Sequence, residues 1–177
     1  MAADQGILRD AMARVPAGVA LVTAHDHTGV PHGFTASSFV SVSMEPPLAL
    51  VCLARTANSF PVFDSCREFA VSVLREDHTE LAMRFARKSA DKFTGGEFIR
   101  TARGGTVLDG ALAVVECTVH ERYPAGDHII LLGEVQSVHV EEKGAPAVYV
   151  DRGFAALCSG TGACVAAAGR GAHAHAG

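Results

Sequence analysis

The stretch GFTASSFVSVSMEPPL, residues 33–48, decides how this sequence is interpreted. Five of its residues carry hydroxyl groups, and they alternate or cluster among Phe, Val and Ala: Thr35, Ser37, Ser38, Ser41 and Ser43. Such a run is poor as plain core, because buried hydroxyls need partners. At a sheet edge and the bend after it, hydroxyls and backbone N–H groups can bind a polar ring and a phosphate. A solvated serine-rich strand and turn is the alternative.

Short β-branched segments surround this stretch and are separated by turn residues. They predict strands at Val19–Thr23, Phe34–Val42, Leu48–Leu53, Phe69–Leu74, Val114–His120 and His128–Val140. Asp26 to Gly29 joins the first two strands, and alternation over 113–120 predicts a half-buried strand. This spacing favours a mainly-β barrel or sandwich over a parallel α/β sheet.

Three helical segments are expected, one before the strands and two between them. Apolar residues at spacings of three and four predict a helix over Asp4–Val15, which Pro16 ends. Two more are expected at Asn58–Cys66 and at Asp77–Phe85, the second with Asp77 as its N-cap. We therefore expect an N-terminal helix packed on the domain (1–15), one β domain (16–159) and, from its Ala, Gly and His content, a flexible C-terminal tail (160–177).

Composition excludes several classes of protein. The chain has 177 residues and a net charge of −4, without a basic stripe, so nucleic acid is not an expected partner. No apolar run is long enough to span a membrane and no signal peptide is evident, which predicts a cytoplasmic protein. The five cysteines (Cys52, Cys66, Cys117, Cys158 and Cys164) lack a C-x-x-C pair, which argues against a disulfide framework and a zinc site.

Common catalytic motifs are missing from the sequence. Residues 160–165, GTGACV, imitate a dinucleotide-binding loop, but the chain ends too soon for the required βαβ unit. There is no Walker loop, nucleophile elbow or H-E-x-x-H motif. His25 with His27, and His173 with His175, have a spacing that can bind metal adventitiously, and we expect no functional metal site.

Several separated motifs together resemble the short-chain flavin reductase family. They are T-A-S-S-F-x-S-V-S-x-x-P-P-L from Thr35, C-L-x-R from Cys52, N-S-F from Asn58, R-K-S-A-D-K-F from Arg87, and G-D-H from Gly126. The resemblance covers about residues 14 to 154. It implies an FMN-binding split barrel that forms a homodimer, typically the reductase component of a two-component flavin-dependent monooxygenase.

The same resemblance implies a set of flavin-binding residues. Thr35, Ala36, Ser37 and Ser38 would contact the isoalloxazine ring, and Ser41, Val42 and Ser43 the ribityl chain and phosphate. Cys52, Leu53, Arg55 and Ser59 would continue the pocket, with Arg55 and the helix start near Ser59 favouring the phosphate. Lys92 would lie near the phosphate with Phe93 packed beside it, His128 would face flavin or nicotinamide, and Tyr149 and Arg152 would lie near the nicotinamide. A solvated lysine and a structural histidine are the alternatives for Lys92 and His128.

The implied reaction is hydride transfer from NADH or NADPH to FAD or FMN, with FAD slightly favoured. It needs no strong protein acid or base, because the cofactors carry the chemistry. Reduced flavin would then diffuse to a separate monooxygenase. Three alternatives remain open: an oxidase of the pyridoxamine-phosphate type, a non-catalytic flavin-binding or electron-carrier protein, and a purely structural β-barrel.

Overall fold

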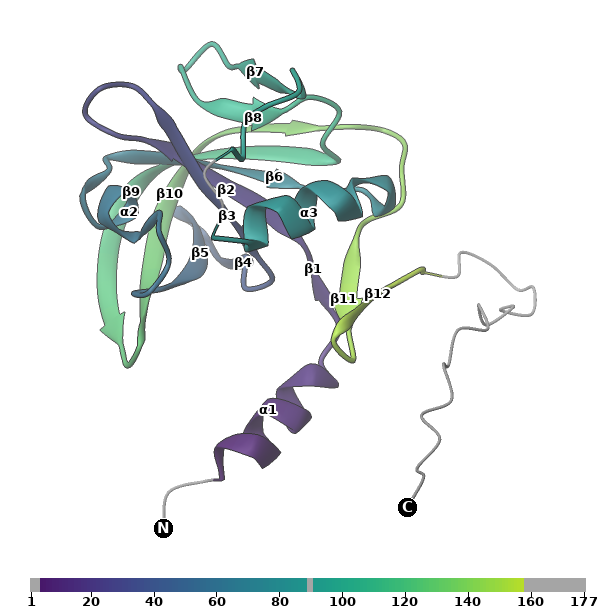
Figure 1. Ribbon diagram of the computed structural model, residues 1–177. Coiled ribbons are helices and arrows are strands. Elements are labelled where there is room, and N and C mark those ends of the chain that lie inside the picture. Colours follow the sequence, from purple (N-terminus) through teal and green to yellow (C-terminus); the bar gives the residue numbers. More distant parts are fainter. Residues whose placement is uncertain (1–3, 89–90, 158–177) are drawn as a thin grey trace, which may run out of the picture.

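A computed structural model describes residues 4–88 and 91–157 of the chain (Figure 1). The helices are α1 (Gln5–Ala13), α2 (Phe60–Ser65), the 3-10 turn η1 (Glu76–His78) and α3 (Thr79–Ala86). The strands are β1 (Ala17–Gly18), β2 (Ala20–His25), β3 (Pro31–Ala36), β4 (Val40–Met44), β5 (Pro47–Ala54), β6 (Glu68–Val73), β7 (Phe98–Arg100), β8 (Thr106–Leu108), β9 (Ala113–Ala125), β10 (His128–Val140), β11 (Val148–Val150) and β12 (Gly153–Ala155).

One curved antiparallel sheet forms the body of the molecule. Its strand order is β3-β2-β6-β9-β10-β5-β4, and two small sheets, β1-β11-β12 and β7-β8, flank it. Every pairing in this sheet is antiparallel, and short turns connect β2 to β3, β4 to β5 and β9 to β10. The two ends of the sheet approach each other after β3, where the main chain of Cys52 on β5 donates a hydrogen bond to the Ser38 hydroxyl at 2.9 Å. The fold is therefore the predicted mainly-β split barrel with flanking helices.

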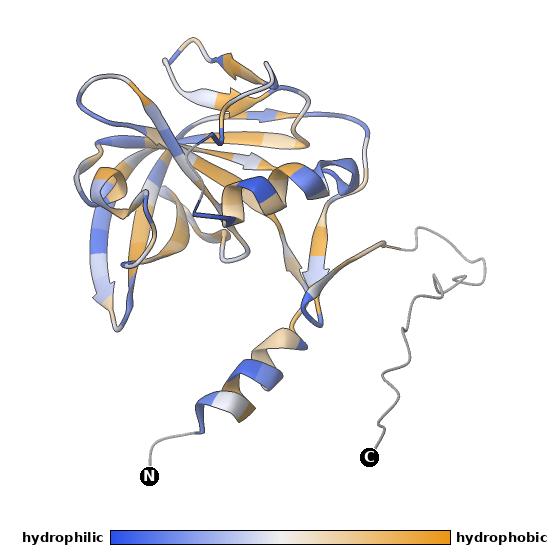
Figure 2. Ribbon diagram, viewed as in Figure 1, coloured by the Kyte–Doolittle hydropathy of each residue, from blue (hydrophilic) through white to orange (hydrophobic). Residues whose placement is uncertain are grey.

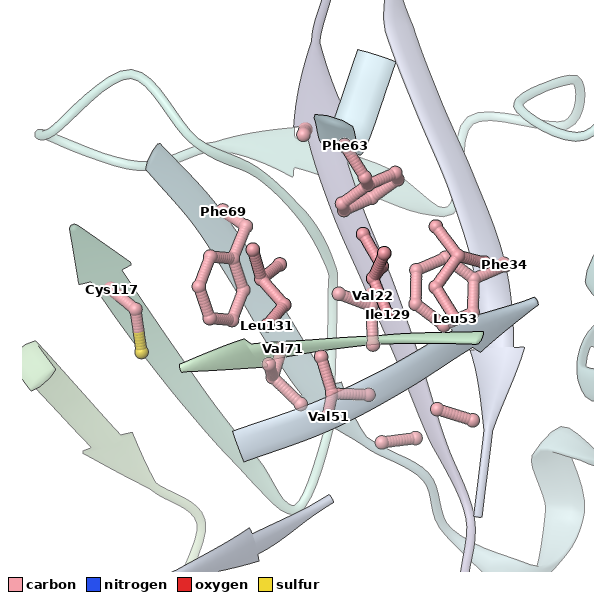
Figure 3. Close-up of a cluster of buried hydrophobic side chains, with 13 residues drawn as sticks. Val22, Phe34, Val51, Leu53, Phe63, Phe69, Val71, Cys117, Ile129 and Leu131 are labelled. Atoms are coloured by element: carbon pink, nitrogen blue, oxygen red, sulfur yellow. The ribbon is translucent and has the colours of Figure 1, made fainter. Parts of the chain in front are cut away.

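The first hydrophobic cluster fills the interior of the curved sheet (Figure 3). Inward-facing residues alternate along each strand, as they must where one face of a strand is buried. Val22 from β2, Val51 from β5, Val71 from β6 and Leu131 from β10 are fully buried. The Phe34 and Phe63 rings meet edge to face at 4.9 Å, which closes the end of this cluster beside α2.

A second cluster covers the outer face of the sheet, which corrects the prediction of a half-buried strand at 113–120. Phe85 of α3 and Val107 of β8 pack on this face together with Leu21 and Val114. Glu116 is also buried there, where its carboxylate accepts hydrogen bonds from the hydroxyls of Thr101 and Ser137. The predicted alternation over 113–120 is present, but Val114 and Glu116 on the side expected to face solvent are buried, whereas His120 stays exposed.

Two other local predictions are also wrong. The single strand predicted over 34–42 is interrupted at residues 37–39, so that β3 ends and β4 begins on the far side of the sheet. Asp77 is not an N-cap, because it lies within η1 and pairs with Arg75, whose hydrogen bond lowers the Asp77 carboxyl pKa to about 2. The helix α3 begins after His78.

The N-terminal helix α1 projects from the body of the molecule (Figure 1). Asp4 caps it by accepting hydrogen bonds from the main chain of Gly6 and Ile7, and none of its residues is buried. The predicted tail at 160–177 lies outside the described residues. Among the residues that the structure describes, no helix is long and apolar enough to cross a bilayer. Within residues 4–88 and 91–157 no three potential metal ligands gather.

Candidate functional site

A cavity of about 430 Å³ opens where the ends of the curved sheet approach each other. Its walls come from the end of β3 and residues 37–38, the end of β5, the loop 56–59 before α2, the C-terminal end of α3, and the first residue of β10. This volume lies in the range of small-molecule and cofactor sites. The break in the strand after β3 is what exposes residues 37–38 to the cavity.

The hydroxyl-rich segment forms one wall of the cavity, and two of its hydroxyl groups make hydrogen bonds that hold the fold together. Thr35 donates its hydroxyl hydrogen to the carbonyl of Ala82 at 2.6 Å, which joins β3 to α3. Ser38 accepts from the amide of Cys52, which joins the two ends of the sheet. Ser37 is exposed beside them and lines the cavity. Two hydrogen bonds therefore fix this wall to α3 and β5, and Ser37 remains in the cavity lining.

Lys92 also lines the cavity and is half-buried between β3 and α3. Its ammonium group donates to the carbonyls of Phe85 at 2.7 Å and Gly33 at 3.1 Å. Burial lowers the pKa of this group, because desolvation disfavours its charged form. Arg87 and Lys88 follow α3 directly and line the same wall, so three cationic side chains border the cavity.

His128 occupies the mouth of the cavity at the start of β10. Its Nδ1 atom lies 2.7 Å from the Asp127 carboxylate, and this hydrogen bond lowers the Asp127 pKa. The carbonyl of Asp127 in turn accepts a hydrogen bond from the amide of Arg55 at 2.9 Å, which fixes the turn against β5. With Nδ1 held by Asp127, the ring presents Nε2 as its other polar atom.

Ser59 lies at the N-terminal end of α2 and is 5% exposed. Its hydroxyl makes no capping hydrogen bond within the described residues, and it lines the cavity. A buried hydroxyl without a capping role is available to a bound ligand.

The structure brings together nine of the sequence-predicted residues. The cavity is lined by Thr35, Ala36, Ser37, Ser38, Cys52, Leu53, Ser59, Lys92 and His128.

The remaining predicted residues lie elsewhere. Ser41, Val42 and Ser43 belong to the edge strand β4, and the guanidinium of Arg55 lies 5.8 Å from the centre of the Phe60 ring. Phe93 packs against Phe85 and Phe98 in the second hydrophobic cluster. Tyr149 and Arg152 line a separate cavity beyond α3. None of these side chains lines the first cavity.

Sequence reasoning missed other lining residues. Phe34, Ala54, Thr56, Ala57, Asn58, Phe85, Ala86, Arg87 and Lys88 complete the wall. Arg87 and Lys88 stand in the R-K-S-A-D-K-F motif, so a search for cations within five residues of Lys92 finds them. Asn58 donates to the carbonyl of Lys88 at 3.2 Å, a contact between distant segments that no local pattern reveals.

The fold is a half-closed antiparallel barrel, and hydroxyl-bearing and cationic residues line the cavity at its opening. These are the features of a split barrel that binds a nucleotide cofactor. The chain belongs to the flavin reductase family, because the model described as "Flavin reductase like domain" matches residues 12–157.

Relatives agree with this assignment. The chain is 90% identical over 177 residues, all of both chains, to the actinorhodin polyketide dimerase of Streptomyces coelicolor. It is 40% identical over 139 residues to the NADH:riboflavin 5'-phosphate oxidoreductase of Streptomyces pristinaespiralis, covering 78% of this chain and 79% of the relative. Several other curated relatives are longer, and the chain spans about half of their length (42% to 57%).

The solved structures include a close match in fold. The Streptomyces globisporus NADH:FAD oxidoreductase SgcE6, in complex with NAD and FAD fragments, has a TM-score of 0.82 and 33% sequence identity. The match covers 88% of this chain and 93% of that chain.

Proposed function

We propose that this protein catalyses hydride transfer from NADH or NADPH to FAD or FMN and releases reduced flavin to a separate monooxygenase. One observation carries the proposal: the wall at 35–38, the cation Lys92 and the ring of His128 border a single cavity. Relatives named as NADH-dependent flavin oxidoreductases support it.

The lining fits a flavin nucleotide. The isoalloxazine ring is flat and largely apolar with a polar rim, which matches a lining that combines Ala36, Cys52 and Leu53 with hydroxyl-bearing residues. The phosphate matches Lys92 and the Ser59 hydroxyl, since a cation and a hydroxyl both bind phosphate oxygens. Of the predicted flavin contacts, Ser41, Val42, Ser43, Arg55 and Phe93 stay outside this proposal, because they do not line the cavity.

A bound flavin supplies a hydride acceptor at N5, and the protein supplies position and electrostatics. The Ser38–Cys52 hydrogen bond fixes the wall against which the ring lies. Asp127 holds Nδ1 of His128, so the imidazole keeps one orientation at the mouth of the cavity, where the nicotinamide must enter. No residue has to remove or deliver a proton for the hydride step.

The decisive experiment measures oxidation of NADH and NADPH with FAD, FMN and riboflavin in turn. Turnover must depend on added flavin and continue when flavin is in large excess over protein. Flavin binding without steady-state turnover would indicate a carrier protein instead. Oxidation of pyridoxamine 5'-phosphate without NADH would indicate the oxidase class, and no uptake of any flavin would contradict the proposal altogether.

The name of the Streptomyces coelicolor relative suggests what the reduced flavin is used for. Oxidative coupling of two polyketide monomers removes two electrons and two protons, reduced flavin supplies two more of each, and together they reduce one O₂ to two waters. We infer that the partner monooxygenase acts on a polyketide. The test is to supply polyketide monomer, NADH, flavin and O₂ with and without the partner; coupling by the reductase alone would assign the dimerisation to this chain.

We further infer that two copies of the chain associate. Seven of the exposed apolar side chains lie on α1 and the turn after it (Ile7, Leu8, Met12 and Val15) and on the edge strand β4 (Val40, Val42 and Met44). Figure 2 shows hydrophobic residues along α1, although this helix lies away from the body. A projecting apolar helix and an open strand edge are both costly unless another surface covers them.

A further inference from the structure

Arg122 lies on β9 and contacts the end of α2 that lies away from the flavin cavity. Its Nε atom donates to the carbonyl of Phe63 at 3.0 Å, and its Nη2 atom donates to the carbonyl of Cys66. Both carbonyls lie at the C-terminal end of α2, where main-chain carbonyls lack helical partners. Arg122 itself does not line the cavity, and the hydride-transfer mechanism does not use it.

Two hydrogen-bonded paths connect Arg122 to Ser59 at the other end of α2. The first runs through Phe63, whose carbonyl accepts from Arg122 and whose amide donates to the carbonyl of Ser59 at 3.3 Å. The second begins at Cys66, whose amide donates to the carbonyl of Val62 at 2.8 Å. The amide of Val62 in turn donates to the carbonyl of Ser59 at 3.1 Å. A displacement at Arg122 therefore reaches Ser59 through one or two residues.

The helix α2 needs such support because it has only six residues. Isolated helices of this length are unstable in water, so contacts with the rest of the protein must hold α2 in place. The ring of Phe63 is fully buried and meets the ring of Phe34, which lines the cavity. This packing anchors one side of the helix, and Arg122 anchors its C-terminal end. A guanidinium at that end also complements the helix dipole.

Ser59 is the residue through which the orientation of α2 affects the cavity. Its hydroxyl does not cap α2, and the residue is buried and lines the cavity. A hydroxyl binds a phosphate oxygen over a narrow range of distances and angles, so a small rotation of the helix weakens that contact. We propose that Arg122 is a positioning residue for flavin binding, which fixes α2 so that the Ser59 hydroxyl faces the flavin phosphate. The inference rests on the proposed function, which places the phosphate beside Ser59 and Lys92.

The first experiment compares FMN with riboflavin, which lacks the phosphate. Fluorescence titration of the full-length protein gives both dissociation constants, and their ratio measures the preference for FMN. Arg122→Met removes both hydrogen bonds and should lower this preference about fivefold, with little change in riboflavin affinity. Arg122→Lys keeps the positive charge and one donor group, so it should show an intermediate preference and provides the test if Arg122→Met is unstable. An unchanged preference in both variants would overturn the inference.

Thr23→Val is the matched control for lost stability. Thr23 is buried on β2 and does not line the flavin cavity, and its hydroxyl donates to the carbonyl of Thr106 at 2.6 Å. The variant should have a lower Tm, as Arg122→Met should, but it should keep the wild-type preference for FMN. An equal loss of the preference in Thr23→Val would show that reduced stability alone explains the effect, and would overturn the inference.

A double-mutant cycle tests whether Arg122 acts through Ser59. Ser59→Ala alone should lower the preference for FMN, because it removes a hydrogen bond to the phosphate. Adding Arg122→Met to this variant should cause little further loss, because the hydroxyl that Arg122 positions is then absent. Losses that add in the double variant would overturn the inference.

Failure of the proposed function is distinguishable from failure of this inference. Wild-type protein that binds flavin but gives no flavin-dependent oxidation of NADH would contradict only the proposed function, since the FMN preference is measured without turnover. Flavin-dependent turnover together with an unchanged FMN preference in the Arg122 variants would contradict only the positioning role of Arg122.

Discussion

The ammonium group of Lys92 donates to the main-chain carbonyl of Phe85, 2.7 Å away at the end of α3. The same group donates to the carbonyl of Gly33 on β3, and Lys92 lines the proposed flavin cavity. One side chain therefore joins β3 to α3 and places a cationic group at the site. Burial lowers the pKa of this group, because desolvation disfavours the charged form.

Lys92→Met should therefore affect stability and phosphate recognition together. Loss of the two hydrogen bonds should lower the free energy of unfolding by about 1 kcal/mol. FMN binding should weaken about tenfold, whereas riboflavin, which has no phosphate, should lose much less. Fluorescence titration measures both affinities. Lys143→Met, at an exposed lysine outside the cavity, is the control. Equal losses for FMN and riboflavin in Lys92→Met would contradict a phosphate role for Lys92.

Sequence patterns predicted the long strands well, because alternation and β-branching act locally. The strand after residue 36 was predicted wrongly for a tertiary reason: the chain stops pairing with β2 and crosses to β5, a change that the continuous run of Ser and Val does not reveal. Glu116 was expected to face solvent because nothing near it in sequence indicates that Thr101 and Ser137 meet it.

The candidate site, like the fold, could be predicted only where its residues stand in local sequence motifs. The hydroxyl-rich segment and Lys92 could be proposed from motifs, and they line one cavity. Arg87 and Lys88 were passed over because a cation in an exposed helix end resembles any solvated charge. The positions of Tyr149 and Arg152 depend on how the β11–β12 hairpin docks beside α3, which is set by contacts with the end of α1 far away in sequence.

Gly133 should be intolerant of any side chain. It lies at an irregularity in the β9–β10 pairing, where an added Cβ would come within 2.5 Å of the Phe69 ring and 2.7 Å of the Cys117 Cβ. Gly133→Ala should cost about 1–3 kcal/mol through overpacking and lower the Tm. Gly18→Ala, where a Cβ meets nothing within 4 Å, is the control. Equal Tm values for the two variants would contradict this packing.

Asp26 organises the β2–β3 turn, and its ionisation should make the stability of the folded state depend on pH. Its carboxylate accepts hydrogen bonds from the Thr28 hydroxyl at 2.7 Å and from the amides of Thr28 and Val30, and these bonds hold its pKa well below the usual range. A depressed pKa stabilises the folded state above the ordinary value near 4, and this stabilisation is lost as the pH falls toward the folded-state pKa.

Thermal melts of the wild type and Asp26→Asn test this dependence of stability on pH. The variant should have a lower Tm than the wild type at about pH 7. The difference in Tm should narrow as the pH falls below about 4, because only the wild type then loses a stabilising carboxylate. Asp64→Asn, an exposed carboxylate on α2, should show no such narrowing. A difference in Tm that stays constant with pH would show that the ionised form of Asp26 contributes nothing to the turn.

Association of two copies should depend on the apolar face of α1. Met12 is 58% exposed and lies on this face with Ile7 and Leu8. Met12→Glu places a charge in the proposed interface and should convert the dimer to a monomer in light scattering after size-exclusion chromatography. Val30→Glu, at an exposed turn away from α1, should leave the mass unchanged. A wild-type protein that is monomeric at high concentration would contradict the association.

His128→Ala should slow hydride transfer more than it weakens flavin binding, because the imidazole stands at the mouth of the cavity and the wall at 35–38 remains. Stopped-flow reduction of bound flavin by NADH measures the transfer, and fluorescence titration measures the binding. His120→Ala, an exposed histidine of β9 outside the cavity, is the control. Asp127→Asn should reproduce part of the slowing, since it weakens the hydrogen bond that orients Nδ1. An unchanged reduction rate in His128→Ala would leave the histidine a structural role only and shift the positioning of the nicotinamide to the wall at 35–38.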